Sequence, residues 1–293
     1  MFSKNKGLIF FVGWYIIVLS YFKEIVMYPY EIGGVITLYG ICVAVGVLAC
    51  FIVFWLLAKR DKLESKYVDF ITINGVITAG VGFFCAALFQ AIYSYIDDPS
   101  KGFDLFGNGL TFLGGFVGGA VTFVGLCLIF AKKFQSKIID ICTSVPLGLL
   151  LGHAFGRLGC VFAGCCYGVP TDSPIGMHFV GVEGKVVPTN LIEAIGLFVL
   201  FVGILIFYLK KPNPYGLPIY LIGYGILRFV IEFWRGDERG GFVPGMSPSQ
   251  FWSLLMIVVG IPLIFILKKL YAKRMEYLKE HPIIEPEKKK KEA

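Results

Sequence analysis

The chain has 293 residues, of which 57% are hydrophobic and only 16% are charged, and its formal net charge is +7. A soluble domain usually carries about 25% charged residues, and a soluble core of this composition would leave large apolar patches in water. The positive charge does not indicate a nucleic-acid partner, because Lys and Arg form short clusters between apolar runs and in the C-terminal tail. We therefore expect an all-α, polytopic integral membrane helical bundle that contacts membrane lipids and no nucleic acid.

Apolar runs divide the chain into candidate spans, since a transmembrane helix needs roughly 20 apolar residues. The first run, Gly7–Phe22, is short and resembles an uncleaved anchor more than a cleaved signal. The runs of sufficient length are Ile32–Leu57, Val68–Ile96, Gly109–Ala131, Lys137–Cys160, Thr189–Leu209, Gly216–Trp234 and Gln250–Leu270. The sequence thus predicts about seven or eight transmembrane helices.

The loops between these runs alternate in charge. Basic clusters follow the first, third, fifth and last long runs, at Lys59–Lys66, Lys132–Lys137, Lys210–Lys211 and Lys268–Arg274. Basic loops stay in the cytoplasm, so the loops around Asp97, Tyr167 and Asp237 are expected to face outward. We expect a single transmembrane domain over residues 1–275 and a basic, disordered cytoplasmic tail over residues 276–293.

Charged side chains within the run Gly216–Trp234 are the first candidates for function. Tyr224, Arg228 and Glu232 are four residues apart and share one helix face, with Arg235 close to it. An intramembrane arginine can bind a phosphate bidentately, and a neighbouring carboxylate can orient it or act as a base. A purely structural Arg–Glu pair is the alternative.

A second arginine lies near the outer end of another predicted span. Arg157 belongs to the glycine-rich segment Gly152–Gly168 and is expected at the same leaflet as Arg228. Two buried arginines at one depth predict a site for an anionic lipid headgroup. A weaker candidate is the run Gly107–Gly119 with Gly114 and Gly115, because glycines alone more often serve helix packing.

Three of the eight cysteines, Cys160, Cys165 and Cys166, cluster beside Arg157. They are interpreted first as reactive thiols whose pKa Arg157 lowers. A disulfide is the next interpretation, because this loop is expected outside the membrane. A zinc site fits less well, since Cys-x4-Cys-Cys is not a common ligand spacing, and simple packing remains open.

The order of these segments resembles that of the prolipoprotein diacylglyceryl transferase family over roughly Glu31 to Leu270. The segment IGYGILRFVIEFWR resembles the family's Tyr-Gly-x-x-Arg-Phe-x-x-Glu-x-x-Arg, and GHAFGRLGC its Gly-Arg-x-Gly-Asn signature. Further similar segments are Tyr39-Gly40, GLTFLGG, PTDSPIGMHF, VPTNLIEA and MSPSQFWSLLMIVVG. The match is most specific in the penultimate helix and around Arg157.

The resemblance implies an enzyme that moves a diacylglyceryl group from phosphatidylglycerol to the lipobox cysteine of a prolipoprotein, while glycerol phosphate leaves. It implies a multi-pass protein of the plasma membrane with its active site toward the outer leaflet. No metal and no soluble cofactor are expected. The implied catalytic residues are Arg228, Glu232, Tyr224 and Tyr39, and the implied substrate-binding residues are Arg157, Arg235, Gly114 and Gly115.

The chain departs from the family at polar positions. Leu113 and Val187 stand where the family has His, Cys160 and Ala163 where it has Asn, and Cys165 where it has Glu. Two other functions are therefore kept open. One is a paralogue with the same headgroup site but another acceptor, or with thiol or redox chemistry through the three cysteines, and the other is an anionic-lipid binder without turnover.

Overall fold

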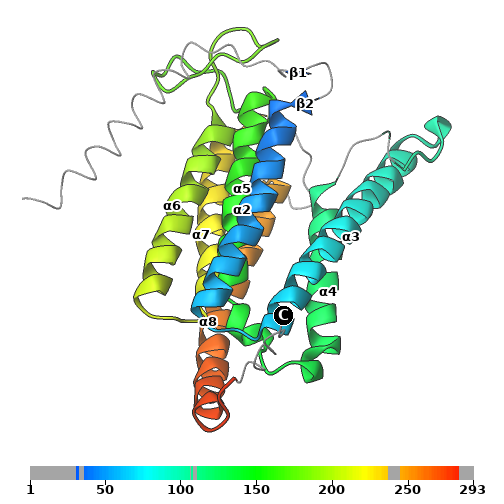
Figure 1. Ribbon diagram of the computed structural model, residues 1–293. Coiled ribbons are helices and arrows are strands. Elements are labelled where there is room, and N and C mark those ends of the chain that lie inside the picture. The colour runs from blue at the N-terminus through cyan, green and yellow to red at the C-terminus, as the bar shows by residue number, and fades with distance from the viewer. Residues whose placement is uncertain (1–30, 33–35, 106, 108–110, 237–244, 284–293) are drawn as a thin grey trace, which may run out of the picture. The chain divides into compact units, whose positions relative to one another are not determined.

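The structure is a computed structural model, and it describes residues 31–32, 36–105, 107, 111–236 and 245–283. Most of these residues are helical (Figure 1). The α-helices in the described part are α2 (Leu38–Arg60), α3 (Ser65–Asp97), α4 (Phe112–Ile129), α5 (Ser144–Phe162), α6 (Thr189–Lys210), α7 (Gly216–Ile231) and α8 (Pro248–Glu280). Two short strands, β1 (Glu31–Ile32) and β2 (Ile36–Thr37), pair antiparallel before α2.

Six of these helices are long and apolar enough to cross a membrane, namely α2, α3, α5, α6, α8 and the segment Gly216–Trp234 that contains α7. The seventh, α4, contributes a shorter apolar stretch, Gly114–Ile129. The prediction of an all-α, membrane-spanning bundle is confirmed, and the chain is a multi-pass membrane protein. The predicted span Gly7–Phe22 lies outside the described residues.

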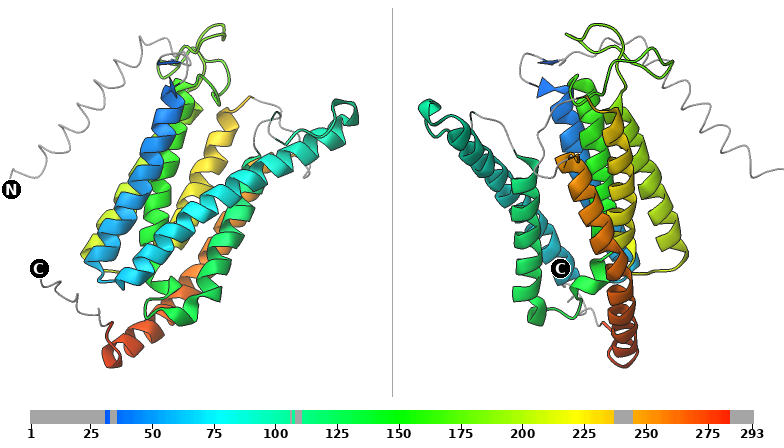
Figure 2. Two further views of the ribbon diagram at one scale, coloured as in Figure 1. Left: turned by 45° about the vertical axis from the view of Figure 1, so that its right-hand side comes forward. Right: turned by 180° about the vertical axis from the view of Figure 1, so that it is seen from behind.

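The chain divides into two compact units. The first comprises the described residues of Met1–Val53, Val145–Lys211 and Tyr215–Ile266, and thus α5, α6, α7 and parts of α2 and α8. Helices α6 and α7 lie side by side within it (Figures 1 and 2). Glycines let its backbones approach: a Cβ on Gly46 of α2 would lie 3.0 Å from the carbonyl oxygen of Gly152 on α5.

The second unit comprises Phe54–Ser144, Pro212–Pro214 and the described part of Leu267–Ala293. Its main element is the pair of helices α3 and α4, which lie along one another (Figure 2). A Cβ on Gly82 would lie 3.1 Å from the carbonyl oxygen of Gly115, and a Cβ on Gly115 equally close to that of Gly82. The buried amide of Asn74 fastens the pair by donating to the carbonyl oxygen of Phe123 at 3.1 Å.

Two expected boundaries differ from the structure. The span expected at Lys137–Cys160 begins only at Ser144, because Ile138–Ile141 form a separate 3-10 turn in which Asp140 is held by side-chain and backbone contacts. Helix α8 continues to Glu280, so residues 276–280 of the expected tail are helical, and residues 284–293 lie outside the described part.

Candidate active site

The polar centre of the first unit is Glu193, which lies one turn into α6 and is fully buried. The hydroxyl of Tyr224 donates to its Oε1 at 2.8 Å, and Nε of Arg157 lies 3.0 Å from the same oxygen. Nη1 of Arg228 faces the other oxygen, Oε2, at 4.0 Å. One carboxylate thus joins side chains of α5, α6 and α7.

Arg228 links this carboxylate to a second one. Its Nη2 lies 2.7 Å from Oε2 of Glu232, one turn later on the same helix face, and donates to the hydroxyl of Ser249 at 3.0 Å. The hydroxyl of Ser247 donates to Oε1 of Glu232 at 2.9 Å. Arg228 and Glu232 are nearly fully buried, so the two charges compensate one another inside the bundle.

The cluster leaves polar atoms unused. Within the described part of the chain, Oε2 of Glu193 and Nη1 of Arg228 are buried and have no hydrogen-bond partner. Buried polar atoms normally have partners, and each exception calls for an explanation. Because these two atoms face one another across 4.0 Å, a polar group of a substrate placed beside them would supply the missing hydrogen bonds.

A histidine, His153, also lies beside Glu193. Nε2 of His153 on α5 lies 4.0 Å from Oε1 of Glu193, and the hydroxyl of Tyr220 lies 3.4 Å from its Nδ1. The ring of His153 meets that of Tyr224 edge to face, with centroids 4.7 Å apart. His153 is therefore positioned by two tyrosines of α7 beside the central carboxylate.

The sequence placed some of these residues correctly and overlooked others. Tyr224, Arg228 and Glu232 do lie along one face, and Arg157 reaches the same carboxylate as Arg228. Glu193 was not among the candidates, although it stands in the quoted segment VPTNLIEA. A carboxylate inside an apolar span is costly unless it is functional or paired, and this signal would have identified it.

The remaining candidates are placed by other contacts. Tyr39 is about half exposed on α2, and a Cβ on Gly159 of α5 would touch its ring at 3.1 Å. Arg235 follows the 3-10 turn Glu232–Trp234 in extended backbone. Gly114 and Gly115 belong to the second unit and contact α3 there, which gives both a packing role and leaves their role in substrate binding a hypothesis.

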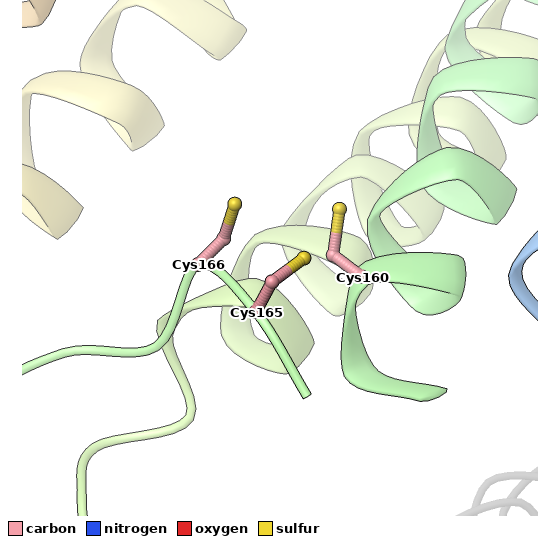
Figure 3. Close-up of side chains that lie close together, drawn as sticks. All are labelled: Cys160, Cys165 and Cys166. Atoms are coloured by element: carbon pink, nitrogen blue, oxygen red, sulfur yellow. The ribbon is translucent and has the colours of Figure 1, made fainter. Parts of the chain in front are cut away.

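The three clustered cysteines are brought together by a turn after α5. Cys160 lies in the last turn of the helix, and the backbone amide of Cys165 donates to its carbonyl oxygen at 3.1 Å. The three sulfur atoms lie within 4.8 Å of one another (Figure 3). All three residues are free cysteines of intermediate exposure.

The turn uses left-handed backbone at two residues. Gly164 has φ 65°, which glycine adopts without cost, but Cys166 has φ 62°. A left-handed conformation costs a residue with a Cβ roughly 1–2 kcal/mol. Two side chains of α6 hold this conformation: Asn190 Nδ2 donates to the carbonyl oxygen of Cys165 at 2.8 Å, and Thr189 Oγ1 to that of Cys166 at 2.9 Å.

The same loop is fixed to the end of the penultimate span. The backbone amide of Val169 donates to the carbonyl oxygen of Trp234 at 2.9 Å, next to Arg235. The pKa of the Cys166 thiol lies well below its ordinary value, because the thiols of Cys160 and Cys165 hydrogen-bond its thiolate and the charges of Arg235 and Arg157 favour it. Within the cluster, the electrostatic environment therefore favours the thiolate at Cys166.

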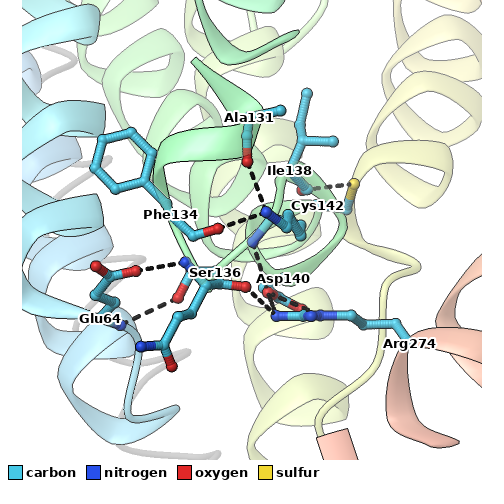
Figure 4. A network of polar contacts seen from close by, with 10 residues as sticks. Glu64, Ala131, Phe134, Ser136, Ile138, Asp140, Cys142 and Arg274 are labelled. Atoms are coloured by element: carbon cyan, nitrogen blue, oxygen red, sulfur yellow. Dashed lines mark hydrogen bonds and ion pairs between the residues drawn. The ribbon is translucent and has the colours of Figure 1, made fainter. Parts of the chain in front are cut away.

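The second unit contains a polar network of a different kind (Figure 4). Arg274 of α8 binds Asp140 bidentately, with Nε 3.0 Å from Oδ1 and Nη2 2.7 Å from Oδ2, and donates to the carbonyl oxygen of Gln135 at 2.8 Å. Glu64 accepts from the backbone amide of Gln135 at 2.7 Å. These contacts join the ends of helices and satisfy one another, which is typical of a structural network.

Comparison with known proteins gives a consistent result. A family model described as prolipoprotein diacylglyceryl transferase matches residues 29–266. A phosphatidylglycerol–prolipoprotein diacylglyceryl transferase of Clostridium tetani is 36% identical over 233 residues, which cover 76% of this chain and 90% of that protein.

The chain belongs to the prolipoprotein diacylglyceryl transferase family. A second relative, phosphatidylglycerol–prolipoprotein diacylglyceryl transferase 2 of Clostridium perfringens, is 32% identical and covers 80% of this chain and 92% of its own length. A transferase of the same name from Hydrogenovibrio crunogenus is 32% identical, with 74% and 86% covered. The diacylglyceryl transferase match includes the whole Glu193 cluster and the three cysteines.

Proposed function

We propose that this protein is an enzyme that transfers the diacylglyceryl group of phosphatidylglycerol to the thiol of the lipobox cysteine in a prolipoprotein. The names of the relatives point to both substrates. The observation that carries the proposal is the pair of arginines around Glu193, of which Arg228 is buried and Arg157 is partly buried, with Nη1 of Arg228 left without a hydrogen bond within the described residues.

The donor's phosphodiester is the group that this cluster would bind. Arg228 is held from one side by Glu232 and Ser249, so its Nη1 is the donor left for a phosphate oxygen. A guanidinium fixed in this way presents a planar fork to a phosphate. Arg157, positioned by Glu193, supplies a second positive charge at the same carboxylate.

The positive charges of the two arginines favour the proposed transfer reaction. The acceptor thiolate attacks the glyceryl carbon, a sulfur–carbon bond forms, and the carbon–oxygen bond to the phosphate breaks. The departing glycerol phosphate keeps the electron pair and gains negative charge, which Arg157 and Arg228 offset. Glu232 keeps Arg228 oriented through the 2.7 Å contact. Tyr224 holds Glu193, the partner of Arg157, through its 2.8 Å hydrogen bond, and Tyr39 is proposed to orient the donor from α2.

The protein is proposed to lie in the plasma membrane with its active site toward the outer leaflet, and the charge pattern of the loops supports this orientation. The end of α8 carries Lys268, Lys269, Lys273 and Arg274, which favours a cytoplasmic end for this helix. The cysteine loop follows α5 at the end that is predicted to face outward. Under this topology the acceptor approaches from outside, and the basic tail stays in the cytoplasm.

The test is direct. The purified full chain is incubated with vesicles containing phosphatidylglycerol and with a lipobox peptide, and the lipidated peptide is measured by mass spectrometry. Lipidation by the wild type and none by Arg228→Ala at equal protein level is the expected result. A wild type that binds phosphatidylglycerol but lipidates no lipobox thiol would overturn the proposal.

A second candidate function is transfer to a different acceptor. It is favoured by one observation, the replacement of family His, Asn and Glu positions by Leu113, Cys160 and Cys165. The same vesicles with other thiol acceptors separate the two functions, because the donor would still be consumed and glycerol phosphate released.

A further inference from the structure

Three thiols at one point of the fold call for a reason beyond packing. Glycine or asparagine would accept the left-handed backbone of residue 166 with less strain than cysteine. The chain instead keeps cysteine at φ 62° and holds it there with Thr189 and Asn190, both fully buried. A strained residue that is held by its surroundings is a sign of function.

The arrangement of the sulfur atoms indicates which function. A disulfide would use two of the three thiols, whereas the sulfur atoms of all three lie close together (Figure 3). Zinc–sulfur bonds of about 2.3 Å place tetrahedral sulfur ligands about 3.8 Å apart. The sulfur atoms already lie within 4.8 Å of one another, so small side-chain rotations bring them to that distance. Thiolates select soft closed-shell cations such as Zn²⁺.

We propose that Cys160, Cys165 and Cys166 bind one Zn²⁺-like thiophilic cation and leave its fourth position open for the thiol of the acceptor. Structural zinc sites use four protein ligands, while catalytic sites use three and keep a position for substrate. Three thiolates and one Zn²⁺ together carry a net charge of one negative unit, and two arginines lie near enough to offset it. Arg157 lies three residues before Cys160 on the same face of α5, and Arg235 adjoins the carbonyl that holds the cysteine loop.

The open position rests on the proposed transferase function and adds a step to it. Each thiol that binds the cation loses its proton to solvent as its sulfur–metal bond forms. The acceptor thiol loses its proton in the same way, so that a thiolate is present at neutral pH. Its sulfur then forms the bond to the glyceryl carbon, and the phosphate oxygen keeps the electron pair of the broken carbon–oxygen bond. The cation would thus activate the acceptor thiol at the place where Cys165 stands instead of the family's Glu.

The cation site is tested without substrate. The full chain, purified in detergent under reducing conditions, is titrated with Zn²⁺. We expect the wild type to bind one Zn²⁺ per chain. Loss of an outer-shell partner of a metal ligand weakens metal binding by about 10–100-fold. Cys160→Ser or Cys165→Ser removes a ligand itself, so each should weaken Zn²⁺ binding by more than that. Cys85→Ser, in the second unit, is the matched control and should bind Zn²⁺ as the wild type does.

If a cysteine variant fails to fold, the wild-type protein provides a second test of the cation site. Stoichiometric Zn²⁺ should protect Cys160, Cys165 and Cys166 of the wild type from alkylation, measured residue by residue by mass spectrometry, and leave the labelling of Cys85 unchanged. No Zn²⁺ binding by the fully reduced chain, or equal alkylation with and without Zn²⁺, would overturn the site.

The open position has its own readout. The chain loaded with Co²⁺ in place of Zn²⁺ should change its visible absorption when a lipobox peptide is added, and a peptide with serine for the cysteine should have no effect. An unchanged spectrum with the cysteine peptide would overturn the open position. A chain that binds Zn²⁺ and the peptide thiol but transfers no lipid would leave the site standing and count against the transferase function alone.

Discussion

The hydroxyl of Tyr224 donates to Oε1 of Glu193 at 2.8 Å and thereby joins α7 to α6 at a fully buried carboxylate of the first unit. The same oxygen lies 3.0 Å from Nε of Arg157. Oε1 of Glu193 therefore positions both Tyr224 of α7 and Arg157 of α5. A change at this carboxylate should alter the geometry of the whole cluster.

Glu193→Gln should reduce lipid transfer by at least about 100-fold, which corresponds to about 2.7 kcal/mol in transition-state stabilisation. The amide still accepts from Tyr224, but Arg157 and Arg228 lose their shared negative charge, and an unpaired buried charge costs about 3–5 kcal/mol. Initial rates with phosphatidylglycerol vesicles measure the effect. Glu183→Gln, in an exposed loop, is the control, and equal rates for both variants would refute a central role of Glu193.

Arg228→Lys should retain only a small part of the activity, and Arg228→Ala none. An ammonium is a point charge, so it cannot contact Glu232, Ser249 and a phosphate oxygen in the directions that the planar guanidinium serves. The transfer rate and the KM for phosphatidylglycerol are measured for both variants and for Arg60→Ala, a partly exposed arginine of α2. If Arg228→Lys transferred lipid at the wild-type rate, the planar guanidinium of Arg228 would not be required for the reaction.

Asp140→Asn should lower the thermal stability of the protein and leave its catalytic constants near those of the wild type. The substitution leaves the buried guanidinium of Arg274 without its bidentate partner, at a cost of about 3–5 kcal/mol. Thermal unfolding in detergent and the transfer rate at low temperature are compared in the same preparation. An intact melting temperature combined with lost activity would assign this network to function.

Cys166 should react with an alkylating reagent at a pH where an ordinary thiol is largely protonated. Its pKa is lowered by hydrogen bonds from the Cys160 and Cys165 thiols and by the charges of Arg235 and Arg157. A lowered pKa means that the thiolate persists as the pH falls, so the rate should decline only in more acidic solution. The metal-free, reduced chain is compared with a cysteine peptide in the same micelles, and superimposable pH profiles would contradict the lowered pKa.

The sequence alone determined that this protein lies in a lipid bilayer, and it determined most of the helices. Apolar runs of about 20 residues can bury their backbone in lipid only as helices, and they predicted α3, α4, α6 and α7 within a few residues. They also predicted α2 and α8, although α2 begins later than the run Ile32–Leu57 and α8 continues beyond Leu270 to Glu280. The spacing of four residues also predicted the pair of Arg228 and Glu232, because the helical repeat alone brings them to one face.

Only the tertiary structure decided which side chains meet across helices. Glu193 looked like one polar residue in an apolar span, and the packing of α5 and α7 against α6 made it the partner of Arg157 and Tyr224. The spacing of the cysteines gave little support to a cation site, since their convergence depends on a left-handed residue that α6 holds in place. Side-chain periodicity belongs to one helix, whereas a site built from several depends on how their backbones approach.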